Sequence, residues 1–449
     1  MQIPEAVSGC IDALERAGFA VYLVGGCVRD ACLGLMPHDF DLCTAALPEQ
    51  TEAVFSNHKL VLAGKKHGTV GVVTDSGVIE ITTFRTEGGY TDNRHPQWVK
   101  FVPDIEADLA RRDFTVNAMA YSPTRGFADP FGGRTDLDAK ILRAVGDPAT
   151  RFEEDSLRIL RGVRFAIRYG LTPEERTLNA MFRLAPLMDN LARERVFEEL
   201  CKLLLLVQPE DLIRFAPVLT QVIPELAPLV GFEQHSAHHA YDVYTHTAHV
   251  TGAVPANLPL RWAALLHDAG KPAAFTMDEA GQGHFYGHAA ESAAIADAVL
   301  RRLKAPTALR EQVVQRIGQH MTKLEPEKRF LRRWLGKLGT EMLDMLLVLQ
   351  EADMGSKGTG KPAEMVQFTE IRAILAEIEA ENACLSLKDL AINGHDLMAL
   401  GYSGKEIGRC LNYLLEQVIE EKLPNEKEAL QNAATNGNTL SFLKQGGSL

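Results

Sequence analysis

The stretch that decides the fold is Gly25-Gly26-Cys27-Val28-Arg29-Asp30, which is followed shortly by Asp39-Phe40-Asp41. A short apolar run at 20–24 precedes it and predicts a buried strand that ends in a glycine turn. The backbone N–H groups of such a turn can approach the phosphates of a nucleotide. Arg29 is close enough in sequence to add a positive charge there. The stretch therefore predicts a strand that delivers a phosphate-binding turn.

Asp39 and Asp41 stand at alternate positions after this turn. Residues two apart on a strand point to the same face, so both carboxylates can hold one or two divalent cations. Two Mg²⁺ ions about 3.5–4 Å apart would activate an attacking hydroxyl and neutralise a leaving pyrophosphate. Glu80 is the lone charge in the alternating run 78–84 and is the candidate third carboxylate. Such short motifs also occur as solvated turns and edge-strand charges, so these three residues alone leave both readings open.

Three motifs in order resemble the class II tRNA nucleotidyltransferases, the CCA-adding enzymes and their poly(A) polymerase relatives within the polymerase-beta-like superfamily. They are the stretches 25–42, Arg111-Arg-Asp-Phe-Thr-Val-Asn-Ala-Met-Ala-Tyr121 and Glu154-Asp-Ser-Leu-Arg158. The resemblance implies an α+β fold, with a small mixed-sheet head followed by an all-helical neck, HD domain and tail. It also implies template-independent addition of C, C and A to the 3′ end of tRNA, with CTP and ATP as substrates, tRNA as partner and Mg²⁺ at the transferase site.

The residues that the resemblance assigns to nucleotide binding lie in these motifs. They are Gly25, Gly26, Arg29, Arg112, Asp113, Asn117, Asp155, Arg158, Arg161 and Arg164.

Asp155 and Arg158 are the candidates for reading the base. They stand three apart on a predicted helix and should share one face. A carboxylate accepts from the amino group of cytosine or adenine, and a guanidinium donates to the neighbouring ring nitrogen or to cytosine O2. Alone, the two residues would be interpreted as an ordinary helix ion pair, but the resemblance favours a protein template that selects C and A. Arg161 and Arg164 continue this face towards triphosphate or primer.

A second set of residues follows the order of an HD-domain phosphohydrolase. Imidazole and carboxylate groups suit a transition metal such as Ni²⁺, Mn²⁺, Co²⁺ or Fe²⁺. The resemblance gives the basic ligand set as His246, His267, Asp268 and Asp353, and the positions for a second ion or a phosphate as His288 and His320. It further suggests hydrolysis of small phosphoesters such as 2′,3′-cyclic nucleotides.

Length and composition limit the remaining classes of protein. The 449 residues favour about three or four domains, which we place at 1–135 (head), 136–231 (neck and base-reading region), 232–355 (HD domain) and 363–449 (a helical tail that binds tRNA). Seven cysteines form no Cys-x-x-Cys pair, which disfavours a disulfide framework or zinc ribbon. The chain has neither a signal peptide pattern nor an apolar run of membrane-spanning length. We therefore expect a soluble, cytoplasmic monomer or homodimer without membrane partners.

The net charge of −12 excludes indiscriminate coating of nucleic acid, so RNA contacts would need local basic patches. Residues 301–337 hold 11 Lys and Arg against 3 Asp and Glu, which fits either an RNA surface or a helix face paired with acids elsewhere. The polar stretch 85–96 resembles the flexible loop used in switching from C to A addition. The glycine-rich stretch 355–362 is expected to be a flexible linker.

Four rival functions have to be weighed. A poly(A) polymerase is disfavoured because residues 64–70 resemble the tRNA-enzyme pattern and no strongly basic tail follows. An enzyme that adds only C, C is disfavoured by the 85–96 loop, whereas an A-adding enzyme stays open. An RNA-binding regulator with an inactive head would lack the carboxylates that this chain retains.

Overall fold

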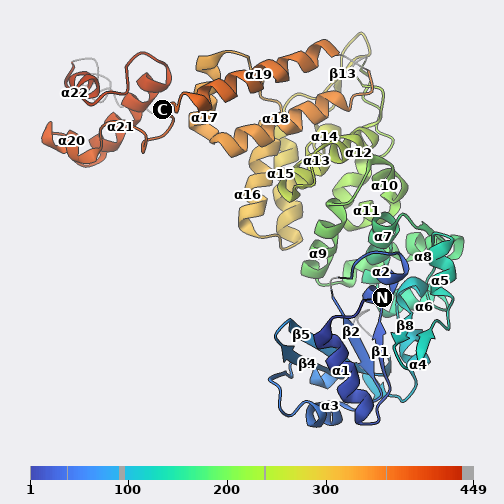
Figure 1. The fold of residues 1–449 in the computed structure, drawn as a ribbon. Coiled ribbons are helices and arrows are strands. Elements are labelled where there is room, and N and C mark those ends of the chain that lie inside the picture. The colour runs from blue at the N-terminus through green and yellow to red at the C-terminus, as the bar shows by residue number, and fades with distance from the viewer. Residues whose placement is uncertain (1, 38, 90–96, 237–238, 360–361, 437–449) are drawn as a thin grey trace. The chain divides into compact units, whose positions relative to one another are not determined.

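The structure is a computed structural model that describes all residues except 1, 38, 90–96, 237–238, 360–361 and 437–449. The chain divides into two compact units. The first comprises residues 1–227 and 299–305, and the second comprises 228–298 and 306–449. Figure 1 colours the chain by residue number, from blue at the N-terminus to red at the C-terminus. No helix in the described ranges is long and apolar enough to cross a membrane.

The first unit begins with a mixed sheet. Within the described residues seven strands pair in the order β3-β4-β5-β2-β1-β8-β9. The central strand β2 is antiparallel to β1 and parallel to β5, and β1 is also antiparallel to β8. The strands are β1 (Val21–Val24), β2 (Asp41–Thr44), β3 (Leu60–Val61), β4 (Thr69–Thr74), β5 (Gly77–Thr83), β8 (Ala120–Ser122) and β9 (Gly126–Ala128).

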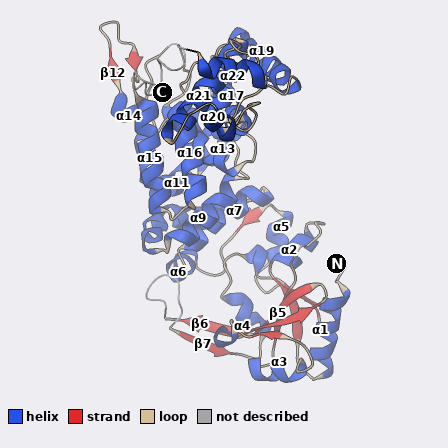
Figure 2. Ribbon diagram, turned by 90° about the vertical axis from the view of Figure 1, so that its left-hand side faces the viewer, coloured by secondary structure: helices blue, strands red, loops and turns tan. Residues whose placement is uncertain are grey.

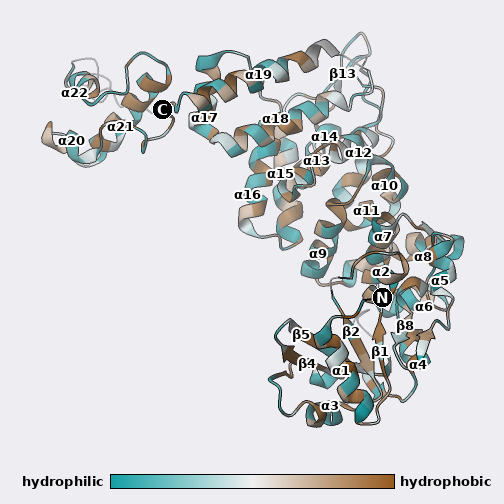
Figure 3. Ribbon diagram, viewed as in Figure 1, coloured by the Kyte–Doolittle hydropathy of each residue, from teal (hydrophilic) through white to brown (hydrophobic). Residues whose placement is uncertain are grey.

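The strands form because their apolar side chains can be buried on the sheet, as the hydrophobic colours of β1 and β4 show in Figure 3. Helices α1 (Glu5–Arg16) and α3 (Pro48–Val54) pack against each other and against the sheet (Figure 2). Helix α1 presents Val7, Ile11 and Leu14 to this core at helical spacing. Helix α1 is thus amphipathic.

Short helices and a hairpin complete the head. Residues 85–96, expected to be a flexible loop, begin with a strand that pairs with another at 98–101, while residues 90–96 lie outside the described part of the chain. The elements are α2 (Gly26–Cys32), η1 (Lys65–His67), β6 (Arg85–Gly88), β7 (Trp98–Phe101), α4 (Ile105–Ala110), η2 (Thr115–Asn117) and α5 (Gly133–Asp138).

The rest of the first unit is helical, apart from the two-residue strands β10 (Ile141–Leu142) and β11 (Thr172–Pro173). The helices are α6 (Pro148–Glu154), α7 (Leu157–Tyr169), α8 (Glu175–Leu184), η3 (Ala185–Asn190), α9 (Arg193–Leu204), α10 (Pro209–Arg214), α11 (Ala216–Val222) and η4 (Pro224–Leu229). Pro148 and Pro209 stand at helix starts, where the missing N–H costs nothing.

The second unit is also mainly helical. Its elements are α12 (Val243–Ala253), α13 (Leu258–Leu266), α14 (Lys271–Ala274), β12 (Thr276–Met277), β13 (Gly283–His284), the first part of α15 (His288–Arg302), α16 (Thr307–Gln319), α17 (Lys328–Leu338), α18 (Thr340–Gly355), α19 (Pro362–Ala380), α20 (Gly394–Ala399), α21 (Lys405–Ile419) and α22 (Lys427–Thr435). Helices α17 to α19 bury one apolar cluster and α20 to α22 another. The predicted fold class, a mixed-sheet head followed by helices, is confirmed; the four domain boundaries stay predictions.

In the part of the basic stretch 301–337 that forms α17, most of the positive charges are paired with acidic residues of the same unit. Lys328 pairs with Glu381, Arg332 with Glu421, and Arg333 with Glu420. This arrangement favours the second of the two readings of that stretch, a helix face that meets acids elsewhere in the chain. All seven cysteines are free, as expected.

Candidate active site and metal centre

The glycine turn forms one wall of a pocket of about 470 Å³ in the first unit. Six arginines and three aspartates line the pocket, together with two glycines, an asparagine and a phenylalanine. The lining residues are Gly25, Gly26, Arg29, Asp41, Arg111, Arg112, Asp113, Asn117, Asp155, Arg158, Arg161, Phe165 and Arg195. The excess of guanidinium groups suits a polyphosphate, because Arg recognises phosphate oxygens with paired hydrogen bonds.

Gly25 ends β1 with a φ of 71°, a conformation that favours glycine. A Cβ atom there would lie 2.8 Å from Nη1 of Arg112, so glycine also makes room for that arginine. Arg29 is buried, donates to Oδ1 of Asn117 at 2.5 Å and forms an ion pair with Asp30 at 2.7 Å. The predicted turn and its arginine therefore meet the 111–121 motif in one pocket.

Asp113 holds two polar side chains of the pocket, those of Arg161 and Asn117, in place. Its Oδ2 accepts hydrogen bonds from Arg161 at 2.7 and 3.0 Å, and its Oδ1 accepts one from Asn117 at 3.0 Å. Burial raises the pKa of this carboxyl, but the charge of Arg161 and the two sets of hydrogen bonds outweigh burial and lower the pKa to about 2. Asp113 is thus an anion at neutral pH that orients Arg161 and Asn117.

Asp155 and Arg158 line the same pocket, but the expectation that one helix carries both is wrong. Asp155 ends α6 in an extended conformation, and α7 begins only at Leu157. The chain breaks there because Oδ1 of Asp155 accepts from the N–H of Leu157 at 3.1 Å and Ser156 donates to the carbonyl of Leu187. The two side chains meet the pocket from either side of a helix break.

Neither side chain is paired with the other. Asp155 forms an ion pair with Arg195 at 3.1 Å, and Arg158 forms one with Glu154 at 2.7 Å. Arg158 also donates to the carbonyls of Arg151 and Arg111. These contacts hold both side chains at the pocket wall. Since Asp155 and Arg158 are not bonded to each other, a nucleobase would not have to separate them.

Arg161 lines the pocket, as expected, whereas Arg164 is not among the lining residues. Arg164 is buried and pairs with Glu199 at 2.6 Å, and its guanidinium stacks over the ring of Phe165. This geometry gives Arg164 a packing role between α7 and α9. Its contact with triphosphate or primer stays a prediction.

The carboxylates Asp39, Asp41 and Glu80 line a second pocket of about 550 Å³. Strand β2 begins at Asp41, so Asp39 precedes the strand rather than standing on it as expected. Asp41 faces solvent, yet partial desolvation raises its pKa, and repulsion by Glu80 and Asp39 raises it further against the opposing charge of Arg112. Such mutual repulsion is what a bound divalent cation would relieve.

Asp41 also lines the arginine-rich pocket. The pocket lined by the three carboxylates and the arginine-rich pocket therefore share this one residue. The residues that line the two pockets come from α2, β2, β5, η2 and α7, so no single motif of the sequence contains the site.

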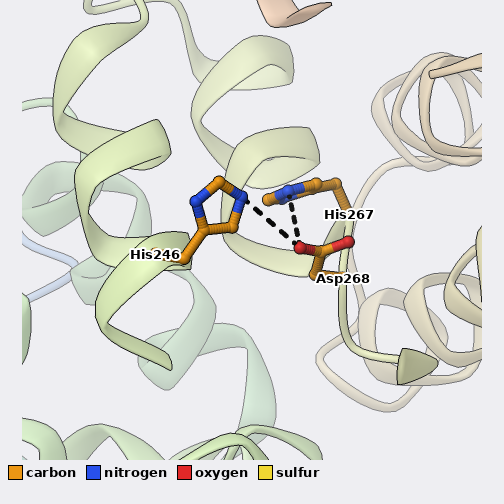
Figure 4. Close-up of side chains that lie close together, drawn as sticks. All are labelled: His246, His267 and Asp268. Atoms are coloured by element: carbon orange, nitrogen blue, oxygen red, sulfur yellow. Dashed lines mark ion pairs between the residues drawn. The ribbon is translucent and has the colours of Figure 1, made fainter. Parts of the chain in front are cut away.

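The second candidate site lies in the second unit. His246 lies on α12, and His267 and Asp268 are the two residues that follow α13; the three side chains point towards one another (Figure 4). Nε2 of His267 lies 3.2 Å and Nε2 of His246 lies 3.5 Å from Oδ2 of Asp268. Asp353, on α18, lies 2.9 Å from Nε2 of His246. The structure thus brings together all four residues of the predicted minimal ligand set.

The remaining two predicted positions join the same cluster through the other oxygen of Asp268. Nε2 of His288 lies 3.4 Å from Oδ1 of Asp268 and 3.2 Å from Nε2 of His320. These three residues can also hold an ion. Asp268 is therefore shared by two overlapping groups of ligands.

The four histidines of the cluster are oriented alike. The Nδ1 atoms of His246, His267, His288 and His320 each lie within hydrogen-bond distance of a backbone carbonyl. A carbonyl only accepts, so Nδ1 carries a proton, and whenever the ring is neutral Nε2 presents a lone pair to the centre. This is the arrangement of metal-ligating histidines.

The titration of the cluster suits cation binding. Burial raises the pKa of Asp268, but the charges of His267 and Lys271 lower it well below its usual range. Burial lowers the pKa of His320 to about 4, with repulsion from His267 adding to the effect. The carboxylate is therefore ionised and His320 is neutral at neutral pH, which is the ligand state of each.

The sequence interpretation missed two buried partners of this cluster. Nζ of Lys271 lies 2.7 Å from Oδ2 of Asp268 and donates to Oε1 of Gln234 at 2.8 Å. The position of Lys271, three residues after Asp268, could have indicated its role. No sequence feature pointed to Gln234. In the first unit, Phe165 and Arg195 were likewise not assigned to the nucleotide pocket.

Comparison with known proteins decides the family. The sequence matches the poly A polymerase head domain over residues 21–143, the probable RNA and SrmB-binding site of polymerase A over 170–229, and the putative tRNA nucleotidyltransferase domain 2 over 287–434. The CCA-adding enzyme of Bacillus velezensis is 32% identical over 423 residues, which are 93% of this chain and 94% of that enzyme. This chain belongs to the CCA-adding enzymes.

Other CCA-adding enzymes match over part of the chain or at the level of the fold. The Streptococcus suis enzyme is 48% identical over 195 residues, but the match covers only 43% of this chain and about half, 48%, of that enzyme. The structure of the Bacillus stearothermophilus CCA-adding enzyme in complex with CTP superposes with a TM-score of 0.69 at 28% identity, covering 98% and 99% of the two chains. That of the Thermotoga maritima enzyme complexed with tRNA has a TM-score of 0.58 at 20% identity, covering 98% and 96%, and shows the fold alone.

Proposed function

We propose that this chain adds C, C and A to the 3′ end of tRNA, using CTP and then ATP. The observation that carries the proposal is that Asp41 belongs both to the carboxylate group with Asp39 and Glu80 and to the arginine-rich pocket. Chemistry at a nucleotide α-phosphate needs this juxtaposition of a cation site and a phosphate cradle.

In this reaction the 3′-oxygen of tRNA attacks the α-phosphorus, the bond to the bridging oxygen breaks, and pyrophosphate leaves. Divalent metal, with Mg²⁺ the ion expected at Asp39 and Asp41, would lower the pKa of the attacking hydroxyl and stabilise the charge on the phosphates. Arg29, Arg112 and Arg161 would bind the triphosphate. Asp155 and Arg158 would face the base from the two sides of the helix break.

The test uses tRNA that lacks its 3′ CCA, incubated with CTP, with ATP or with both. Addition of two residues from CTP alone and of a third only with ATP supports the proposal. A product that grows from ATP alone on a tRNA already ending in CC, with no use of CTP, would instead identify an A-adding enzyme. A long ATP-dependent tail would identify a poly(A) polymerase.

Removal of one carboxylate tests the assignment of the site. Asp41→Ala and Asp39→Ala should each lower the rate of addition by about 10³-fold or more, the scale of losing metal-based charge stabilisation. Asp75→Ala, in the exposed turn between β4 and β5, removes a carboxylate outside both pockets and should leave the rate unchanged. Near-normal addition by a folded Asp41→Ala variant would refute the assignment.

The histidine cluster supports a second function, metal-dependent hydrolysis of phosphoesters by an HD domain. His246, His267, Asp268 and Asp353 would hold a transition metal (Ni²⁺, Mn²⁺, Co²⁺ or Fe²⁺), and His288 and His320 would add ligands for a second ion or contact phosphate.

Two features of the cluster fit a cation. Nε2 of His267 is buried without a hydrogen bond. Nε2 of His288 and Nε2 of His320 lie 3.2 Å apart while both Nδ1 atoms face backbone carbonyls, so their lone pairs repel unless both bind one cation or one Nε2 carries a proton. The metal would polarise the phosphate and activate water. Hydrolysis of 2′,3′-cyclic nucleotides by the full chain with added Mn²⁺ or Ni²⁺, lost with a chelator, is the test.

A further inference from the structure

A small pocket of about 200 Å³ opens beside the histidine cluster in the second unit. Two residues of the cluster, His320 and Asp353, form part of its lining. The other walls come from the segment after α16, the end of α18 and the first half of α19. A molecule in this pocket would therefore touch the ligands of the proposed metal centre directly.

Lys357 lines this pocket and its backbone is held in place on both sides. The carbonyl of Ser356 lies 3.3 Å from Nδ1 of His246, and the carbonyl of Lys357 accepts from the N–H of Ala240 at 2.9 Å. Gly358 lies so close to Tyr241 that a Cβ would approach its ring to 2.7 Å. The start of the expected flexible linker, residues 356–358, is thus a fixed wall of the site, which corrects that expectation for these residues.

Two glutamines fix other parts of the pocket wall. Nε2 of Gln350 donates to the carbonyls of His320 and Thr322 at 2.9 and 2.7 Å. Nε2 of Gln367 donates to the carbonyl of Leu324 at 2.6 Å. The pocket therefore has a preformed shape, as small-molecule sites usually do.

The charge of the pocket favours an anion. Lys357 and Lys323 are its two lysines. Lys323 is 82% exposed at its side chain and lies 3.7 Å from Glu325, whereas within the described ranges no ion pair engages Lys357. A lysine acts as a point charge for phosphate, and a bound metal would add positive charge at the other end of the pocket.

We propose that this pocket is the phosphate subsite of the hydrolase centre and that Lys357 recognises a phosphoryl oxygen of a nucleotide phosphoester. The inference rests on the proposed hydrolase function. The pocket volume is below the range of sites that enclose a whole drug-sized ligand. It accommodates the phosphate and the group next to it, with the apolar side chains of Met354, Phe368 and Ile371 against that group, while the remainder of the nucleotide stays outside.

The experiment compares Lys357→Gln with Lys323→Gln in the full chain loaded with Mn²⁺. Calorimetric titration with inorganic phosphate should show binding weakened about tenfold or more in Lys357→Gln, because one hydrogen bond to a charged group is lost. KM for 2′,3′-cyclic AMP should rise by a similar factor with little change in kcat. Lys323→Gln should weaken phosphate binding less than Lys357→Gln, because Lys323 is largely exposed and lies near Glu325. Lys388→Gln, an exposed lysine outside the pocket lining, should behave as wild type. Lys357→Arg should recover part of the affinity, and Mn²⁺ affinity should be equal in all variants.

Two outcomes separate this inference from the hydrolase proposal. If wild type hydrolyses cyclic nucleotides but Lys357→Gln retains the wild-type KM and phosphate affinity, the subsite assignment is overturned and the hydrolase survives. If wild type hydrolyses nothing while phosphate binding still depends on Lys357, the anion subsite is supported and the hydrolase proposal fails.

Discussion

Asp155 and Arg158 illustrate how a residue can reach its site with a different local structure from the one expected. Each side chain is engaged by another charge, Asp155 by Arg195 and Arg158 by Glu154. Since both line the arginine-rich pocket, a base could take over hydrogen bonds without the two groups first having to separate. Base selection would then depend on the helix break that holds them apart.

Arg158→Ala should relax discrimination between nucleotides. A hydrogen bond to a charged group contributes about 1.5–3 kcal/mol, so incorporation of UTP or GTP relative to CTP should rise by about 10- to 100-fold. Asp155→Asn should weaken selection against UTP in particular, because an amide can donate to uracil O4. Competition between nucleotides on a tRNA primer measures both ratios.

The matched control is Arg176→Ala, whose side chain is 74% exposed and lies outside the pocket lining. It should leave every ratio unchanged. Unchanged ratios in the Arg158 and Asp155 variants as well would mean that other residues read the base.

At the scale of the element, α7 depends on one glycine in its interior. Gly162 lies against Phe114 and Met181, so a Cβ there would approach Cζ of Phe114 to 2.8 Å. The ring of Phe114 cannot move away easily, because it is fully buried and packs against Phe152 and Phe165. Gly162 thus brings α7 close to the 111–121 motif, and with it Arg158 and Arg161.

Gly162→Ala should destabilise the first unit although alanine is the better helix former. Overpacking of a core costs about 1–3 kcal/mol, against a gain in helix propensity of about 1 kcal/mol. Gly9→Ala, in the middle of α1 in the same unit, meets nothing within 4 Å and should raise stability by about 0.5–1 kcal/mol. Urea unfolding followed by circular dichroism reports both changes; stabilisation by both substitutions would contradict the packing argument.

At the scale of the whole molecule, the two candidate sites belong to different compact units. Asp41 lies in the first unit and Asp268 in the second. Each site is complete within its own unit, because its lining or ligand residues all come from that unit. The two activities should therefore be separable by single substitutions.

Asp268→Ala should abolish transition-metal-dependent hydrolysis of 2′,3′-cyclic nucleotides, because both groups of ligands share this carboxylate. Addition of C and A to tRNA should continue at the wild-type rate. Asp41→Ala serves as the reciprocal variant and should show the opposite pattern. Parallel loss of both activities in a folded Asp268→Ala protein would show that the sites are coupled, and absence of hydrolysis in wild type would leave the second unit a structural role.

The sequence by itself determined the order of the elements in the head and the identity of most side chains in the two sites. The run at 20–24, the glycine turn and the alternating run at 78–84 became strands and a turn because local periodicity and glycine conformation are properties of short segments. The order of motifs identified the family, and the histidines and aspartates of the second site were named correctly as a group that converges.

Only the tertiary structure decided how these side chains meet. The break between α6 and α7 depends on Ser156 bonding to a carbonyl 31 residues away, and the pairing of Arg164 with Glu199 joins two helices. Lys357 lies in the stretch expected to be a linker, yet the contact of its carbonyl with Ala240 and that of the preceding Ser356 with His246 fix it beside the cluster. Such contacts join residues distant in sequence, and no local pattern records them because their energy exists only once the chain has folded.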